Sequence, residues 1–101
     1  MTEIIVFGEL FEWEQSKASS NKNKHGISFE TASQIFLGEC LFLLDDGSDP
    51  SEERWLAIGL LSDTAVVVVY AERGEWLRLI SARRATRQER EMLFRELGIQ
   101  V

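Results

Sequence analysis

The strongest constraint on the fold of this 101-residue chain is a run of four valines, Val66 to Val69, inside the apolar segment Ala65–Ala71. Consecutive apolar residues in an extended strand place apolar side chains on both of its faces. Such a strand is stable in the interior of a sheet, where both faces are covered. The run therefore predicts a central strand.

The segments on either side of this run predict the rest of the sheet. The turn Ser62-Asp63-Thr64 joins it to the preceding segment, and Glu72 to Glu75 forms the turn that follows it. Strands joined by such short turns form mostly antiparallel sheets, so we expect about four to five strands. The further strands are predicted at Ile4–Phe7, Cys40–Leu44, Trp55–Leu61 and Trp76–Ser81.

Three segments have the pattern of helices. The first spans Trp13 to His25 and ends at Gly26, and it is polar on nearly every side. The second is capped by Ser28 and buries a stripe that recurs every three or four residues. The third opens with the capping box Thr86-Arg87-Gln88-Glu89 and ends at Gly98. The predicted stripes are Phe29, Ala32, Ile35 and Phe36 in the second helix, and Met92, Leu93 and Leu97 in the third. The expected fold is one α+β domain over residues 1–101, with the helices packed on the sheet.

Composition excludes several classes of protein. With 45% apolar and 28% charged residues, the chain is neither disordered nor fibrous. Cys40 is the only cysteine, which excludes an internal disulfide, and we expect it to be buried as a small apolar residue. The N-terminus resembles neither a signal peptide nor a membrane span, so we expect a cytoplasmic protein with no membrane contact.

The net charge of −6 conceals two basic islands in an acidic body. Residues 1–16 carry a charge of −4 and residues 26–72 carry −8, whereas residues 17–25 carry +3 and residues 73–95 carry +4. A separation of charge of this kind says more about binding partners than the total does.

The first basic island places Lys17, Asn21, Lys24 and His25 on one stripe of the first predicted helix. Two ammonium groups, an amide and the only imidazole could together hold phosphates and move a proton near neutral pH. The alternative interpretation is a solvated helix face whose histidine closes the helix end. The spacing alone does not decide between these two.

The second island combines Arg78, Arg83 and Arg84 with the N-terminus of the third predicted helix. Backbone N–H groups and guanidinium groups at such a position bind anions well. The alternative is that these arginines pair with acidic residues of the chain. Glu53 could act as a general base next to Arg54, but the acidic stretch Asp45–Glu53 lacks the spacing of a calcium loop, so we expect no metal site there.

The sequence pattern predicts the order strand, helix, helix, four strands, helix. A set of short segments also stands in a specific order and spacing: Phe11-Glu12-Trp13, Lys17, Asn21, Lys24–Glu30, Ala32 and Phe36, Glu53-Arg54-Trp55, Ile58-Gly59, Val68-Val69-Tyr70, Glu72-Arg73-Gly74, Ile80–Ala85 and Glu89-Arg90. With these segments the chain resembles the BrnT family of bacterial type II toxins over about residues 11 to 92. The resemblance implies a RelE-like fold.

The resemblance also implies a function. A BrnT-like chain would be a cofactor-free, metal-independent endoribonuclease that a ribbon-helix-helix antitoxin similar to BrnA neutralises, and it would contact DNA only through that antitoxin. By position, the implied catalytic residues are Lys24, His25, Glu53, Arg54, Arg83 and Arg84. The implied or candidate RNA-binding residues are Lys17, Asn21, Tyr70 and Arg78.

The expected reaction is attack of a ribose 2′-OH on the adjacent phosphorus, which leaves a 2′,3′-cyclic phosphate. It needs a proton acceptor, for which His25 and Glu53 both remain candidates, and cations around the phosphoryl oxygens. The alternative function is a catalytically weak or inactive binding module that pairs with an antitoxin in operon autoregulation. Convergence of His25, Glu53, Arg83 and Arg84 on one cleft would favour the enzyme, whereas dispersal of these groups or internal salt bridges among them would favour the module.

Overall fold

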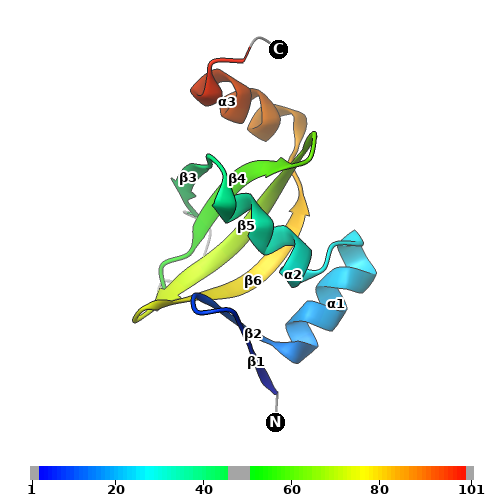
Figure 1. The fold of residues 1–101 in the computed structure, drawn as a ribbon, viewed down its shortest axis with the longest axis vertical. Helices are drawn as coiled ribbons and strands as arrows, with labels where there is room; N and C mark the ends of the chain where they lie inside the picture. Colours follow the sequence, from blue (N-terminus) through cyan, green and yellow to red (C-terminus); the bar gives the residue numbers. More distant parts are fainter. Residues whose placement is uncertain (1–2, 46–50, 100–101) are drawn as a thin grey trace.

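The computed structural model describes residues 3–45 and 51–99. They form a six-stranded sheet in the order β1-β2-β6-β5-β4-β3, with helices packed on both faces (Figure 1). Adjacent strands are antiparallel except β2 and β6, which are parallel. The elements are β1 Ile4–Phe7, β2 Phe11–Glu14, α1 Gln15–His25, α2 Phe29–Ala32, the 3₁₀ helix η1 Ser33–Leu37, β3 Leu41–Leu44, β4 Trp55–Leu61, β5 Thr64–Arg73, β6 Trp76–Arg84 and α3 Arg87–Leu97.

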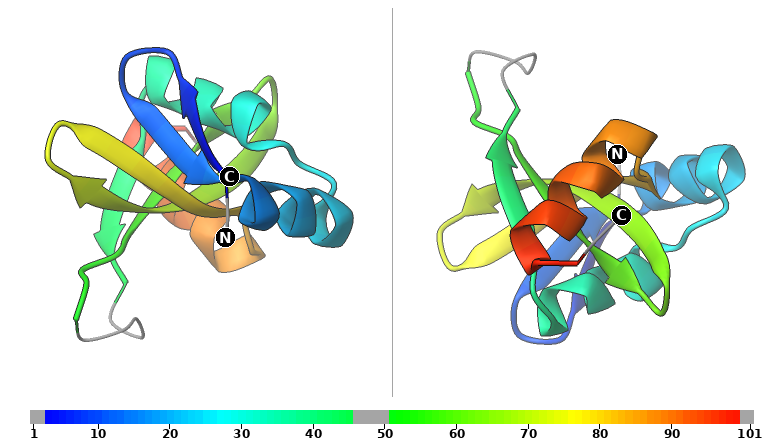
Figure 2. Two further views of the ribbon diagram at one scale, coloured as in Figure 1. Left: turned by 90° about the horizontal axis from the view of Figure 1, so that it is seen from below. Right: turned by 90° about the horizontal axis from the view of Figure 1, so that it is seen from above.

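The central strand is where the four valines predict it. β5 lies between β4 and β6, and its valines alternate between two cores. Val66 and Val68 pack with Trp13 and Phe29 on one face of the sheet, whereas Val67 packs with Leu93 of α3 on the other. The two further views of the molecule show α2 and α3 on opposite sides of this strand (Figure 2).

The expected α+β class is confirmed, but the expected count of four to five strands is wrong. The additional strand is β2, at a place where the sequence pattern predicts the beginning of the first helix. Trp13 is only 1% exposed because its indole packs edge-on against the ring of Phe29, with the ring centroids 5.6 Å apart. It also pairs in register with Leu79 of the distant strand β6. The contacts of Trp13 with Phe29 and β6 hold residues 11–14 in an extended conformation, although helix α1 begins at the next residue.

The second predicted helix begins at Ser28, whose hydroxyl accepts a hydrogen bond from the N–H of Thr31. Its predicted stripe is buried at Phe29, Ala32 and Ile35. After four residues the α-helix gives way to η1. The Ser33 hydroxyl donates to the carbonyl of Glu30, and such local bonds compete with regular helical hydrogen bonding.

A β-bulge in β6 decides which of its side chains face the core. Val69 pairs with Ser81 while Tyr70 pairs with Leu79, so Ile80 is an extra residue in the ladder. As a result Leu79 and Ala82 both join the core beneath α2, although they are three residues apart. Arg83 is thereby directed to the opposite face of the sheet, as Val67, its partner in β5, also is.

The helix ends follow the local signals. Gly26 and Gly98 adopt the left-handed conformation, with φ of 73° and 76°, directly after the last residues of α1 and α3. The capping box predicted at Thr86 and Glu89 is present. Within the described ranges, no helix is long and apolar enough to cross a membrane.

The contact between η1 and β4 makes a stability prediction at Gly59. A Cβ at this position would lie 2.8 Å from the Cβ of Ile35 and 3.1 Å from the Sγ of Cys40. Gly59→Ala should therefore lower the free energy of unfolding by about 1–3 kcal/mol, because the core would have to shift. Gly38→Ala is the control, since its nearest neighbour would lie at 4.0 Å. Urea unfolding of both variants measures the difference, and equal stabilities would contradict the predicted clash.

Candidate functional site

Two adjoining hollows lie between α1, β6 and the start of α3. The first has a volume of about 500 Å³ and the second about 360 Å³, and both are lined by Lys24 and His25. We call them together the basic groove. The other residues that line the first hollow are Arg83, Arg84 and Thr86. Those that line the second are Ser16, Lys17, Ser20, Asn21, Arg54, Ile80 and Ser81.

The groove has a buried amide at its base that fixes α1 to β6. Asn21 is 7% exposed, and its Nδ2 donates to the carbonyl of Ala82 at 2.9 Å and to that of Ile27 at 3.1 Å. In return the N–H of Ala82 donates to Oδ1 of Asn21 at 3.0 Å. The side-chain amide of Asn21, a predicted phosphate-binding residue, is thus hydrogen-bonded to the backbone. These hydrogen bonds hold α1, with Lys17 and Lys24, beside the sheet.

Arg83 enters the groove with its guanidinium already paired. Nη1 and Nη2 donate to the two carboxylate oxygens of Glu89 at 2.7 and 2.9 Å. The same carboxylate accepts the N–H of Thr86 at 2.8 Å, as part of the α3 cap. The hydrogen bond from Arg83 lowers the pKa of Glu89 to about 2, with the Thr86 bonds acting in the same direction and burial opposing them. This bond also raises the pKa of Arg83. The second basic island is therefore partly neutralised from within, while Arg83 keeps 30% of its side chain exposed.

The other four cations of the groove have no such partner in the part of the chain that the structure describes. Among the described residues, no ion pair involves Lys17, Lys24, Arg54 or Arg84. The Nε of Arg54 is buried and makes no hydrogen bond within that part of the chain. A buried donor without an acceptor is costly, and an anionic oxygen in the groove would satisfy it.

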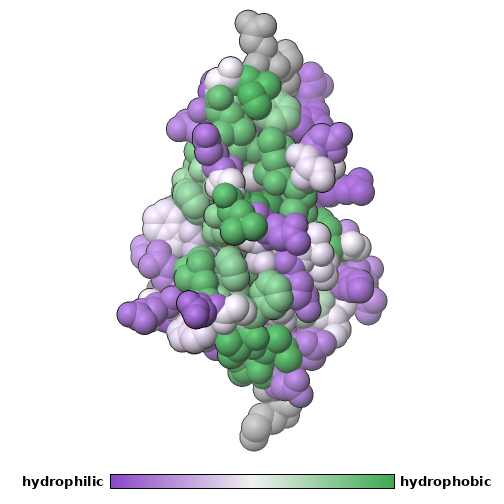
Figure 3. Space-filling view, viewed as in Figure 1, coloured by the Kyte–Doolittle hydropathy of each residue, from purple (hydrophilic) through white to green (hydrophobic). Residues whose placement is uncertain are grey.

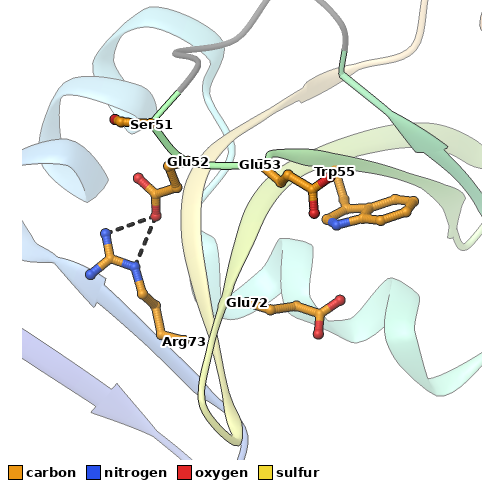
Figure 4. Close-up of a pocket in the computed structure, with 6 residues that line it drawn as sticks. All are labelled: Ser51, Glu52, Glu53, Trp55, Glu72 and Arg73. Carbon is orange, nitrogen blue, oxygen red and sulfur yellow. Dashed lines mark hydrogen bonds and ion pairs between the residues drawn. The ribbon is translucent and has the colours of Figure 1, made fainter.

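Glu53 does not lie in the basic groove. It lines a separate hollow of about 590 Å³ together with Ser51, Glu52, Trp55, Glu72 and Arg73 (Figure 4). Arg73 pairs there with Glu52, at 2.8 Å. Although this hollow is larger than either hollow of the basic groove, its three carboxylates would repel a phosphate. Of the two candidate bases, the structure brings only His25 together with the cations.

Two further candidate residues also lie elsewhere. Tyr70 is 6% exposed, and its ring packs edge-on against that of Phe36 at 5.5 Å. Burial raises the pKa of Tyr70, and the charge of Glu72 raises it further. Arg78 pairs with Glu12 and lies 3.9 Å from a carboxylate oxygen of Glu14, both on β2. Neither residue lines the groove.

Two residues that line the groove, Ser16 and Ser20, are not among the candidates from the sequence. They are four residues apart, which places them on the same face of α1 as Lys24, and this spacing was the available signal. The hydroxyls of Ser81 and Thr86, beside the second basic island, also line the groove. Within residues 3–45 and 51–99, no cluster of three His, Cys, Asp or Glu side chains could hold a metal ion.

The groove therefore joins five cationic side chains, one imidazole and several hydroxyls, and no carboxylate is among the described residues that line it. Such a surface can bind successive phosphates, stabilise charge on a phosphoryl group and transfer a proton.

Comparison with known proteins agrees with this chemistry. A model of the family described as the ribonuclease toxin BrnT of type II toxin–antitoxin systems matches residues 13–89, well over half of the chain. No curated protein matches the sequence.

The Arg83–Glu89 pair predicts how stability changes with pH. The pKa of Glu89 is about 2 in the folded chain and has an ordinary value of 4.5. The pair therefore stabilises the fold fully above about pH 5, and this contribution is lost as the pH falls toward 2. Glu89→Gln should lower the free energy of unfolding by about 1–2 kcal/mol at pH 7, given the partial exposure of the pair. Urea unfolding between pH 7 and pH 3 measures this difference, and a difference that stayed constant would contradict the assignment.

Proposed function

This chain belongs to the BrnT family of ribonuclease toxins, and we propose that its basic groove is the active site of a metal-independent endoribonuclease. Family membership supports a toxin role, ribonuclease activity in general and an antitoxin as partner. The observation that carries the proposal is the position of His25. The only imidazole of the chain lines both hollows and lies among the cations.

The proposed reaction is in-line attack of a ribose 2′-OH on the adjacent phosphorus. His25 accepts the proton of the 2′-OH as the bond from this oxygen to phosphorus forms and the bond to the 5′-oxygen breaks. The departing 5′-oxygen takes a proton from solvent water, and His25 returns its proton to the solvent, so that the products are a 2′,3′-cyclic phosphate and a 5′-OH. Arg83 and Arg84 stabilise the charge on the phosphoryl oxygens, and Lys24 positions the phosphate. Arg54 would donate its unpaired Nε to the same or a neighbouring phosphate.

The acidic total charge is compatible with RNA binding because the groove is locally basic. RNA affinity depends on the cations near the phosphates and on salt. Lys17, Lys24, Arg54 and Arg84 have no ion-pair partner within the described chain, so they are available to phosphates. The antitoxin would be of the ribbon-helix-helix type, and the fold RelE-like, as the resemblance implies.

Two observations favour the alternative of a binding module. Glu53 lies apart from His25, Arg83 and Arg84, in the hollow that Arg73 lines. The bidentate pair with Glu89 occupies two nitrogens of Arg83, the kind of internal salt bridge expected if the groove only retains the toxin shape. Under this alternative the chain would bind its antitoxin and repress its operon without cleaving RNA. A cleavage assay separates the two functions.

The enzyme proposal predicts cleavage of a mixed-sequence RNA in the presence of EDTA. His25→Ala and Arg83→Ala should each lower the rate more than tenfold, because they remove the proton acceptor and a phosphoryl-stabilising cation. Arg87→Ala is the matched control, since Arg87 is 85% exposed on α3 and pairs with Glu91 outside the groove. Analysis of the RNA ends should find 2′,3′-cyclic phosphates. Intact RNA at low salt and high enzyme concentration, with and without ribosomes, would favour the binding module.

The two sides of α1 provide a second prediction. Lys24 lines the basic groove, whereas Lys22 lines a different hollow beside Phe29 and Glu30. Lys24→Ala should weaken binding of single-stranded RNA and reduce the slope of log affinity against log salt by about 0.7, because one phosphate contact is lost. Lys22→Ala, which changes the net charge equally, should leave the slope unchanged. Fluorescence anisotropy at several salt concentrations measures both, and equal effects would show that the groove does not direct binding.

A further inference from the structure

The hairpin of β1 and β2 exposes four large apolar side chains. Ile4, Val6, Phe7 and Leu10 are each at least 40% exposed, and Val6 reaches 59%. They make up half of the large hydrophobic residues that are exposed in the described chain. Figure 3 shows apolar side chains gathered at the end of the molecule that carries the N-terminus. Ile4 and Val6 share one face of the hairpin, whereas Phe7 lies on the other, where its ring centroid is 5.6 Å from that of Trp13. Exposed apolar side chains on both sides of a sheet edge are typical of an interaction surface.

The backbone of β1 is also available for pairing, because β1 is the last strand at its edge of the sheet. The N–H of Gln15 donates to the carbonyl of Glu3 at 2.8 Å, so the backbone N–H and C=O groups of Glu3 are directed toward β2. In an antiparallel pair the inward-facing residues alternate. Ile5 and Phe7 therefore bond to β2, whereas the N–H and C=O groups of Ile4 and Val6 point away from the sheet. Within the described chain, Ile4 and Val6 therefore combine unpaired backbone groups with exposed apolar side chains.

Carboxylates surround this edge. Ile4 pairs with Glu14 and Val6 with Glu12, so these side chains share one face of the hairpin. Glu3 and Glu9 are exposed and take part in no ion pair among the described residues. Residues 1–16 contain four glutamates and no basic residue. Arg78 compensates only part of this charge, through Glu12 and Glu14.

We propose that the edge of β1 is the docking site for an extended segment of the antitoxin, which adds a strand to the sheet. The segment would place aliphatic side chains beside Ile4 and Val6 and carry Lys or Arg residues that reach the surrounding carboxylates. A second copy of this chain fits less well, because edge-to-edge pairing would bring two acidic hairpins together. The proposal rests on membership in a two-component toxin family, and not on the cleavage mechanism.

Hydrogen exchange of single amides tests the strand pairing directly. In the purified chain, the amides of Ile4 and Val6 should exchange quickly and those of Ile5 and Phe7 slowly. Addition of the cognate antitoxin should slow exchange at Ile4 and Val6 by at least tenfold, since their N–H groups acquire acceptors. Binding without protection of these two amides, or no binding at all, would overturn the proposal.

Two variants at one position separate the backbone from the side chain. Val6→Pro removes an outward N–H that β2 does not use, and proline is tolerated at strand edges. It should weaken antitoxin binding at least tenfold, whereas Val6→Thr keeps the N–H and should weaken binding less. Circular dichroism and RNA cleavage of the antitoxin-free variants show whether the fold and the groove are intact, so failure of docking and failure of catalysis are read separately. Unchanged binding by Val6→Pro, or a change only in the oligomeric state of the free chain, would contradict antitoxin docking at this edge.

Discussion

The reciprocal hydrogen bonds between Asn21 and the backbone of Ala82 are the interaction on which the basic groove depends. Helix α1 has few apolar side chains, so hydrophobic burial alone cannot hold it against the sheet. Asn21 supplies specific hydrogen bonds in place of an apolar stripe. Without these hydrogen bonds, the buried N–H and C=O of Ala82 would each destabilise the fold by about 1–3 kcal/mol. Lys17, Lys24 and His25 are brought beside β6 because this single amide is satisfied there.

The bulge at Ile80 connects the same strand to the chemistry. With regular alternation Leu79 and Arg83 would point to one face of β6, and an arginine would have to enter the core beneath α2. The extra residue directs Leu79 and Ala82 to the core and Arg83 to the groove. Glu89 then fixes the guanidinium of Arg83 and caps α3 with the same carboxylate. The bulge at Ile80 and the carboxylate of Glu89 therefore couple the packing of the core and the cap of α3 to the orientation of Arg83.

Local signals predicted much of the fold and only part of the site. The valine run, the short turns and the capping box each act within a few residues, so β5, the β4–β5 hairpin and the start of α3 follow from the sequence. Strand β2 could not be predicted, because Trp13 is ordered by Phe29 and Leu79, which are distant in the chain. In the site, Lys24, His25, Arg83 and Arg84 were identified because each lies in a basic island of the sequence. The other placements depend on tertiary contacts that no local pattern reports. They are the separation of Glu53 from His25, the burial of Tyr70 and the pairing of Arg78 with β2.

The fold also separates the charges of an acidic chain into surfaces of opposite sign. In sequence the acidic hairpin and the basic helix α1 are adjacent, with −4 over residues 1–16 and +3 over residues 17–25. In space β2 directs its carboxylates to Arg78 and the edge of β1, whereas α1 turns its ammonium groups to β6. Because exposed charges are screened beyond roughly 8–10 Å at physiological salt, a phosphate chain in the groove responds to the local cations rather than to the total of −6. A basic partner would be attracted to the hairpin by the same rule, so the proposed RNA surface and the proposed antitoxin surface can lie apart on one small domain.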